Sequence, residues 1–230
     1  MVRLVLFDID GTLVHTGGAG VKAFAKVFAD EFKAVDGFEK LKFAGRTDTG
    51  LVREFFGYHH IATTPKNFQR FFERYVFWLD HILRQSKCKV CPGVWEFVRG
   101  LQAVAQPPLM GLLTGNIRLG AEIKLRHLAL WDLFQTGAFA DDHEERNHIA
   151  AIARQRGSRV LGEELEDDQV LIIGDTPLDI RCGRAIGAKV LAVATGSFGV
   201  DELKLHDPDW AVEELGALQA EEVILEAVKR

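Results

Sequence analysis

Residues 4–14 read Leu-Val-Leu-Phe-Asp-Ile-Asp-Gly-Thr-Leu-Val. The four apolar residues Leu4–Phe7 are typical of a short buried strand, and this strand ends at two carboxylates, Asp8 and Asp10. Gly11 then permits a sharp turn of the backbone. Ligands of open parallel sheets bind beyond the carboxyl ends of the strands, so the pair of carboxylates is placed for chemistry.

Two carboxylates this close raise each other's pKa when no counter-charge lies between them. A hard cation with oxygen ligands removes that conflict, and Mg²⁺ is the usual one. The alternative interpretation is an acidic turn after a strand, because Asp and Gly also favour turns for local reasons. The two interpretations differ in whether other parts of the chain supply matching groups.

The chain has 230 residues, of which 47% are hydrophobic and 27% are charged, and its net charge is −5. This composition supports a sizeable core, either in one large domain or in a core domain with an insert. The negative charge argues against a nucleic-acid partner. No apolar run approaches the roughly 18 residues of a membrane span. The three cysteines suggest no disulfide framework, and the early first strand leaves no room for a signal peptide, so we expect a cytoplasmic protein without a membrane partner.

Further apolar runs end in small or polar residues and predict additional strands at Leu109–Leu113, Val170–Ile173 and Val190–Val193, with weaker candidates at Ala138–Ala140 and Trp210–Val212. Helical patterns lie between these runs, at residues 93–105, 116–130, 145–157 and 178–187. Continuous apolar strands that alternate with helices are typical of a doubly wound parallel α/β sheet, with a Rossmann-like core.

The segment 15–91 breaks this alternation, because it shows no clear strand. Apolar residues recur at helical spacing from Val21 to Phe32 and again from Phe68 to Leu83, and Pro65 suits the first turn of the second helix. Eleven of the sixteen phenylalanines fall in this segment, which indicates a compact helical unit with its own core.

The predicted organisation is therefore a core domain made of residues 1–14 and 92–230, interrupted by an all-helical insert at 15–91. The insert follows directly after the strand that carries the carboxylate pair, so we expect it to sit over that site. Glycines at the first crossing and Pro92-Gly93 at the second mark the two connections.

Three more segments place polar groups after predicted strands or at predicted helix starts: Thr114-Gly115-Asn116, Arg146, and Gly174-Asp175-Thr176-Pro177-Leu178-Asp179. The first offers a hydroxyl and exposed amides, which suit an anion. The last puts two further carboxylates on a tight turn. Four carboxylates can share one divalent cation, while a hydroxyl and a guanidinium hold the other oxygens of a phosphate; these residues are Asp8, Asp10, Asp175, Asp179, Thr114 and Arg146.

This order of motifs resembles the haloacid dehalogenase superfamily, in particular its phosphoglycolate-phosphatase-like branch, over nearly the whole chain. The first motif, Asp-x-Asp-Gly-Thr, stands at residues 8–12. The second, an apolar strand ending in Thr or Ser, stands at 112–114, and the fourth, Gly-Asp-x-x-x-Asp, stands at 174–179. The helical segment matches the cap that this branch inserts between the first two motifs.

The third motif departs from the family pattern, which usually has a Lys at the start of the helix that precedes the fourth motif. Here residues 141–147 fill that position, and Arg146 is their only cation. Arg is not equivalent to Lys, because its planar fork can brace two oxygens at once. Lys124, on the helix after the second motif, is the competing candidate. His143 and His148 nearby are interpreted as a solvated rim and not as a metal cluster.

The resemblance implies a mechanism in which Asp8 attacks phosphorus and forms an aspartyl-phosphate. Asp10 would protonate the leaving oxygen and then activate the hydrolytic water, and its backbone carbonyl is the family's metal contact. Mg²⁺, Thr114 and Arg146 would neutralise the charge on the phosphoryl oxygens. A dehalogenase needs neither a metal nor an acid at position 10, so this set of acids favours phosphoryl chemistry.

The stretch Gly45-Arg46-Thr47-Asp48 resembles the specificity loop of the family's cap. In one interpretation, Arg46 pairs with a carboxylate or a second phosphate of the substrate. In the other, the stretch is a solvent-facing helix cap built on Thr47 or Asp48. The sequence leaves both open.

The function that these features predict is a Mg²⁺-dependent phosphatase acting on a small phosphorylated metabolite, phosphoglycolate-like or a sugar phosphate. Three alternatives stay open: a sugar-phosphate mutase of the same fold, a haloacid dehalogenase, and a phosphate-binding protein with little turnover. The sequence does not choose between a monomer and a homodimer.

Overall fold

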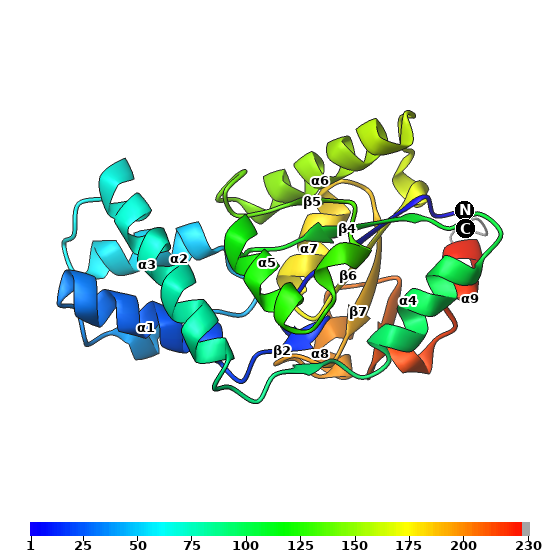
Figure 1. The fold of residues 1–230 in the computed structure, drawn as a ribbon. Coiled ribbons are helices and arrows are strands. Elements are labelled where there is room, and N and C mark those ends of the chain that lie inside the picture. Colours follow the sequence, from blue (N-terminus) through cyan, green and yellow to red (C-terminus); the bar gives the residue numbers. More distant parts are fainter. Residues whose placement is uncertain (227–230) are drawn as a thin grey trace.

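A computed structural model describes residues 1–226, and a six-stranded parallel sheet forms the centre of its larger part (Figure 1). The strands are β1 (Leu4–Phe7), β4 (Leu109–Leu113), β5 (Thr136–Ala138), β6 (Val170–Gly174), β7 (Lys189–Val193) and β8 (Trp210–Val212). Their order across the sheet is β5-β4-β1-β6-β7-β8, and each neighbouring pair is parallel. The predicted doubly wound α/β fold is confirmed.

Helices cover both faces of this sheet (Figure 1). One face packs against α6 (Arg146–Leu161) and α7 (Pro177–Ala185), with the short α8 (Val200–Lys204) near β7 and β8. The other packs against α4 (Val94–Ala103), α5 (Arg118–His127) and α9 (Ala220–Glu226). Short 3-10 helices lie at Phe38–Lys40, Trp131–Leu133, Asp167–Gln169 and Leu215–Ala217. None of the helices within residues 1–226 combines the length and apolarity needed to cross a bilayer.

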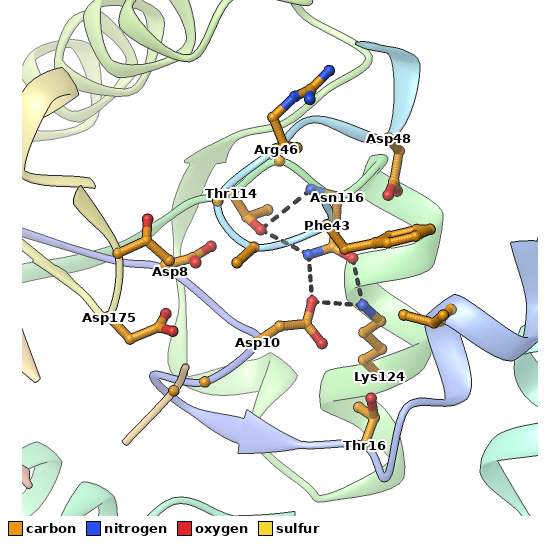
Figure 2. A pocket seen from close by; sticks show the side chains of 18 of the residues that line it. Asp8, Asp10, Thr16, Phe43, Arg46, Asp48, Thr114, Asn116, Lys124 and Asp175 are labelled. Carbon is orange, nitrogen blue, oxygen red and sulfur yellow. Dashed lines mark hydrogen bonds and ion pairs between the residues drawn. The ribbon is translucent and has the colours of Figure 1, made fainter. Parts of the chain in front are cut away.

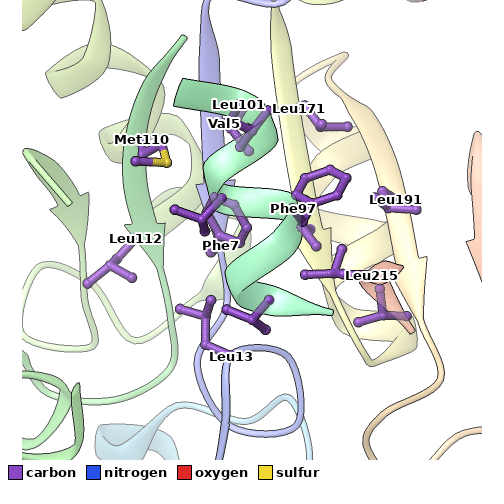
Figure 3. Packing of buried hydrophobic residues seen from close by; sticks show 14 of the residues in the cluster. Val5, Phe7, Leu13, Phe97, Leu101, Met110, Leu112, Leu171, Leu191 and Leu215 are labelled. Atoms are coloured by element: carbon purple, nitrogen blue, oxygen red, sulfur yellow. The ribbon is translucent and has the colours of Figure 1, made fainter. Parts of the chain in front are cut away.

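Alternation along β1 explains why its four apolar residues are all buried. Val5 and Phe7 point into the cluster that includes Phe97 and Leu101 of α4 (Figure 3). The intervening leucines of β1 point to the opposite face, into the cluster formed with α6. A strand buried on both faces reads as a continuous apolar run, which is the pattern seen in the sequence.

A separate group of helices lies beside the sheet (Figure 1). It contains α1 (Ala19–Phe32), α2 (Asp48–Tyr58) and α3 (Pro65–Leu83), and Pro65 stands in the first turn of α3. Aromatic rings fill its interior: the ring centroids of Phe28 and Phe71 lie 4.6 Å apart, and those of Phe28 and Phe55 lie 3.8 Å apart. The sequence analysis assigned no helix to α2.

Two predictions about boundaries are wrong. The segment 15–91 was expected to hold no strand, but β2 (Val14–His15) pairs antiparallel with β3 (Lys89–Val90) where the chain enters and leaves the helical group. Strands of two residues are too short to leave a period-2 pattern. The strand expected at Ala138–Ala140 is instead β5, because residues 136–138 are the ones that pair with β4.

The strand order reverses at β1, which has β4 and β5 on one side and β6, β7 and β8 on the other. Such a switch point opens a crevice at the carboxyl ends of the strands, where ligands of open α/β sheets bind. Asp8 follows β1 directly and therefore stands at the mouth of this crevice.

Candidate active site

A cavity of about 430 Å³ lies between the carboxyl ends of the central strands and the helical group. It is lined by most of the predicted site residues, namely Asp8, Asp10, Arg46, Asp48, Thr114, Gly115, Asn116, Arg146 and Asp175. Thr47 and Asp179 do not line it directly, but the two residues that flank Thr47 do, and so does Arg146, which donates to Asp179. The fold therefore brings together groups that lie more than 150 residues apart in the chain.

Three carboxylates form a buried cluster at one end of this cavity. Asp8, Asp175 and Asp179 each offer an oxygen within 4.8 Å of the oxygens of the other two. Burial raises the pKa of Asp8 to about 6 and the pKa of Asp175 well above its ordinary value. Buried acids this close are the kind of donor set that a hard divalent cation takes, since the cation offsets both the repulsion and the lost hydration.

The side chain of Asp10 does not join this cluster. Figure 2 shows its carboxylate directed toward Asn116 and Lys124, on the side away from Asp8 and Asp175. The Asp10 side chain also keeps 43% of its surface exposed, so it has room to move. The two carboxylates of the first motif thus face different partners.

Asp179, the acid of the cluster that lies on α7, is held in place by several hydrogen bonds. Thr176 caps this helix, and its backbone N–H and hydroxyl both donate to Asp179 Oδ2, at 3.1 and 2.7 Å. The second carboxylate oxygen of Asp179 accepts from Arg146. Asp175 accepts a hydrogen bond from the Thr12 hydroxyl at 3.1 Å. Asp175 is therefore the freer of these two acids.

Gly11 is needed beside this cluster. Its φ is +85°, in the region that favours glycine, and a Cβ there would lie 2.4 Å from Asp175 Oδ2. Any side chain at this position would displace the Asp175 carboxylate.

Arg146, the first residue of α6, contacts two acids of this cluster, Asp8 and Asp179. Its Nη2 lies 3.2 Å from Asp8 Oδ1, and its Nη1 donates to the backbone oxygen of Gly45 at 3.2 Å. Burial would lower the pKa of Arg146, but the carboxylates of Asp179 and Asp8 outweigh this and raise it well above its ordinary value. Its Nε is buried and has no hydrogen-bond partner within residues 1–226.

Lys124, the competing candidate, occupies a different position. Its Nζ lies 2.6 Å from Asp10 Oδ2 and 2.6 Å from Asn116 Oδ1 (Figure 2). The structure therefore places Arg146 next to Asp8 and Lys124 next to Asp10. The pairing of Lys124 with Asp10 was not predicted. Its only trace in the sequence is a Lys on the helix that follows the second motif.

The second motif supplies polar groups from the end of β4. Thr114 is fully buried, and its Oγ1 accepts from the side-chain amide of Asn116 at 2.8 Å. A Cβ on Gly115 would lie 2.1 Å from the backbone oxygen of Arg46, so only glycine allows the loop of the helical group to approach this closely.

The stretch 45–48 links the helical group to the sheet domain. Thr47 is the N-cap of α2: its hydroxyl accepts from Gly50 N and donates to the backbone oxygen of Glu144 at 2.8 Å. The backbone N–H of Asp48 donates to the Gly115 oxygen at 2.7 Å, and Asp48 Oδ2 accepts from Ile117 N at 2.8 Å. Thr47 thus caps a helix as one interpretation expected, but neither Thr47 nor Asp48 faces solvent: both are buried, and Asp48 docks the loop on the core.

Arg46 lines the cavity, but its guanidinium is bound elsewhere. Its Nη2 donates to Glu54 Oε2 at 2.7 Å, and Figure 2 shows the side chain directed away from Asp8 and Asp10. His143 and His148, interpreted as part of a solvated rim, are both exposed.

Comparison with known proteins shows which family the sequence of this chain matches. Residues 5–193 match the model of the haloacid dehalogenase-like hydrolases. The chain is 23% identical over 222 residues to pyrophosphatase PpaX of Anoxybacillus flavithermus (strain DSM 21510 / WK1). The aligned residues cover 94% of this chain and 95% of that protein. It is 25% identical over 190 residues to a bifunctional riboflavin kinase/FMN phosphatase of Arabidopsis thaliana, covering 82% of this chain but only 48%, about half, of the relative. The crystal structure of a predicted phosphoglycolate phosphatase from Haemophilus somnus 129pt has the same fold, with a TM-score of 0.71, 19% identity and coverage of 94% and 95%.

The chain belongs to the haloacid dehalogenase-like hydrolase family, because the family match spans most of its length. This confirms the resemblance drawn from the three motifs. It also confirms the predicted class of enzyme, a hydrolase of the phosphatase type.

Proposed function

We propose that this protein is a Mg²⁺-dependent phosphatase that hydrolyses a small phosphorylated metabolite, phosphoglycolate-like or a sugar phosphate, through an aspartyl-phosphate. The surroundings of Asp8 carry the proposal. This carboxylate belongs to an acidic cluster that fits a cation, and a buried guanidinium lies 3.2 Å from it. A phosphate placed between these two positive charges meets its nucleophile with its own charge neutralised.

The residues proposed to hold Mg²⁺ are Asp8, Asp175 and Asp179, together with the backbone carbonyl of Asp10. Their fit rests on the cluster of three buried acids and on the raised pKa of Asp8 and Asp175. A bound Mg²⁺ would supply charge stabilisation for the phosphoryl oxygens.

In the proposed reaction, an oxygen of Asp8 attacks phosphorus, the ester oxygen departs, and the phosphoryl group becomes bound to Asp8. Asp10 gives its proton to the departing oxygen. It then accepts a proton from the water that attacks the aspartyl-phosphate, so both residues return to their starting states. With a pKa of about 6, Asp8 is mostly ionised at pH 7, as a nucleophile must be.

The phosphoryl oxygens are proposed to be held by the Thr114 hydroxyl, the backbone amides of Gly115 and Asn116, and the Arg146 guanidinium. The unpartnered Nε of Arg146 supports this role, because buried N–H groups rarely lack an acceptor. An oxyanion beside Asp8 is the ligand that this guanidinium suits.

We further propose that residues 1–14 and 92–230 act as the catalytic core and residues 15–91 as a cap that closes over the substrate. The loop of Arg46, Thr47 and Asp48 would set the position of the cap through its hydrogen bonds to the core. The working form is a cytoplasmic monomer or homodimer.

Release of inorganic phosphate tests the proposal. Wild type, Asp8→Asn and a surface control, Asp201→Asn, are compared over a panel of phosphorylated metabolites, with Mg²⁺ or with a chelator; Asp201 is fully exposed on α8. We expect release that needs Mg²⁺ and falls by at least about 10⁴-fold in Asp8→Asn. A phosphoenzyme should be trapped in wild type and be absent from Asp8→Asn.

Metal-independent release that survives Asp8→Asn would contradict the proposal. Interconversion of sugar phosphates without net release would instead identify a mutase, and halide release from 2-haloacids a dehalogenase. Binding of phosphate esters without any turnover would identify a phosphate-binding protein.

A further inference from the structure

Three cations line the cavity within the described part of the chain: Arg46, Lys124 and Arg146. Arg46 pairs with Glu54, which takes no part in the proposed reaction, and Arg146 keeps its pairing with Asp179 when Asp8 is phosphorylated. Lys124 is different, because its carboxylate partner is Asp10, the side chain that has to reach the leaving oxygen. When Asp10 turns toward phosphorus, Lys124 is left without the partner that neutralises it.

The groups around Asp10 form a preorganised binding site for an anion. Lys124 Nζ and Asn116 Nδ2 both donate to Asp10 Oδ2, at 2.6 and 2.9 Å. Asn116 Oδ1 also accepts from Lys124 Nζ at 2.6 Å, which fixes the two donors relative to each other. Only 5% of the Lys124 side chain is exposed. A buried ammonium that loses its carboxylate requires another anion in the same place.

Tyr75, on α3 of the helical group, adds a second and independent observation. It is 1% exposed and lines the cavity, yet its hydroxyl makes no hydrogen bond to any residue in the range 1–226. A Cβ on Gly20 would lie 3.4 Å from Lys124 Nζ and 3.6 Å from Tyr75 Oη, so the ammonium and the hydroxyl border the same space. A hydroxyl that opens onto the cavity beside a buried ammonium is placed to donate to the same ligand oxygen as that ammonium.

We propose that Lys124, Asn116 and Tyr75 form a subsite for the leaving group, which binds a second anionic group of the substrate, and that this group exchanges with the carboxylate of Asp10. The inference rests on the proposed phosphatase activity and deepens it. The substrate is then a phosphate monoester whose alcohol carries a carboxylate or another phosphate. Binding of that group displaces the Asp10 carboxylate, which takes a proton from solvent and can then give it to the leaving oxygen, whereas a neutral leaving group leaves Asp10 bound to Lys124.

Three matched esters test this exchange: 2-phosphoglycolate, ethylene glycol bisphosphate and the neutral-ended 2-hydroxyethyl phosphate. The first two distinguish a carboxylate from a phosphate as the second anion. We expect wild type to have a kcat/KM about 100-fold higher for one or both anionic esters than for 2-hydroxyethyl phosphate, the effect of one charge-assisted hydrogen bond or ion pair.

The variants Lys124→Met and Tyr75→Phe then assign the subsite. Lys124→Met should lose about 100-fold in kcat/KM for the preferred anionic ester, mainly through KM. Its kcat/KM for 2-hydroxyethyl phosphate should not fall and should rise, because the cation that holds Asp10 away from the leaving oxygen is gone. Tyr75→Phe should lose about 10-fold in kcat/KM for the preferred anionic ester and should not lose activity on 2-hydroxyethyl phosphate. Lys66→Met, an exposed Lys on α3, is the matched control. Arg46→Ala tests the other cation proposed to contact the substrate.

Several outcomes would overturn the subsite. If wild type hydrolyses all three esters with equal kcat/KM, the proposed subsite is refuted, whereas the proposed phosphatase activity stands. Equal losses of kcat on every ester in Lys124→Met would show that Lys124 only positions Asp10, and a selective loss confined to Arg46→Ala would move the subsite to Arg46. No phosphate release from any ester or from the wider metabolite panel would instead refute the proposed function itself.

Product inhibition of wild type decides the question if Lys124→Met does not fold. Glycolate and ethylene glycol have the same size and differ in charge. Glycolate should inhibit at least about 10-fold more tightly, and equal inhibition by the two would overturn the proposal.

Discussion

Asp48→Asn tests how the helical group is held to the sheet domain. Asp48 Oδ2 accepts from Ile117 N at 2.8 Å, just before the first turn of α5, and the side chain is buried. An Asn at this position keeps an acceptor for that N–H and has nearly the same shape, but it carries no charge. The substitution therefore isolates the cost of burying the ionised carboxyl.

The magnitude follows from the pKa of Asp48. Burial raises it from an ordinary value of 3.8 to about 7, and Asp10 and Asp141 act in the same direction, while Lys124 and the hydrogen bond from Ile117 oppose it. Between these two pH values the folded state holds a proton that the unfolded state has lost. The free energy of unfolding therefore falls as pH rises from about 4 to about 7. At 1.36 kcal/mol per pKa unit, the upper limit is about 4 kcal/mol.

Urea denaturation between pH 5 and pH 8.5, in the presence of a chelator, measures this effect. Relative to wild type, Asp48→Asn should become steadily more stable as the pH rises, by a few kcal/mol at pH 8, because Asp8 and Asp175 titrate in both proteins and cancel in the comparison. Asp48→Ala, which removes the acceptor, should be about 1 kcal/mol less stable than Asp48→Asn throughout. Parallel pH curves for wild type and Asp48→Asn would refute the reasoning, since they would show that Asp48 is ionised and hydrated in the folded protein.

Two further predictions concern the metal cluster and the loop that meets it. Mg²⁺ at 10 mM should stabilise wild type by about 1.4 kcal/mol if its Kd is about 1 mM, and Asp175→Asn should abolish this shift in Tm; an equal shift in both proteins would place the ion elsewhere. Gly115→Ala should raise KM and lower the free energy of unfolding by about 1–3 kcal/mol, because its Cβ would lie 2.1 Å from the Arg46 oxygen and force the loop away from the core. Unchanged steady-state kinetics in Gly115→Ala would show that this contact is not maintained in solution.

Much of the sheet domain was predictable from sequence because its strands are buried on both faces. The apolar runs at β1 and β4 predicted the boundaries of these strands to the residue. The weaker run at β8 also matched, although this edge strand is only partly buried. The predicted helix at 145–157 was too short, because α6 continues to Leu161 and ends at Gly162, which has a φ of +73°. Its last turns are polar on most sides, so hydrophobic periodicity does not extend to the end.

The docking of the loop at residues 45–48 was not predictable, because it depends on tertiary contacts that leave no local pattern. Asp48 looks like an ordinary first-turn acid of α2 in the sequence. Its carboxylate instead accepts a hydrogen bond from Ile117, a residue 69 positions away. The pairing of Lys124 with Asp10 spans 114 positions and is equally invisible to periodicity.

Both candidates for the cation of the third motif, Arg146 and Lys124, are buried, and each contacts a different acid of the first motif. Arg146 has a planar fork that never loses its charge and binds two carboxylates and a backbone oxygen at once, which suits a permanent position beside the nucleophile. Lys124 is a compact point charge with rotatable donors, so it can exchange one anion for another without rearranging the backbone. In the proposed subsite, Asp8 keeps a fixed partner and Asp10 has an exchangeable one. This difference matches their proposed roles, since the nucleophile must stay in place whereas the acid must move.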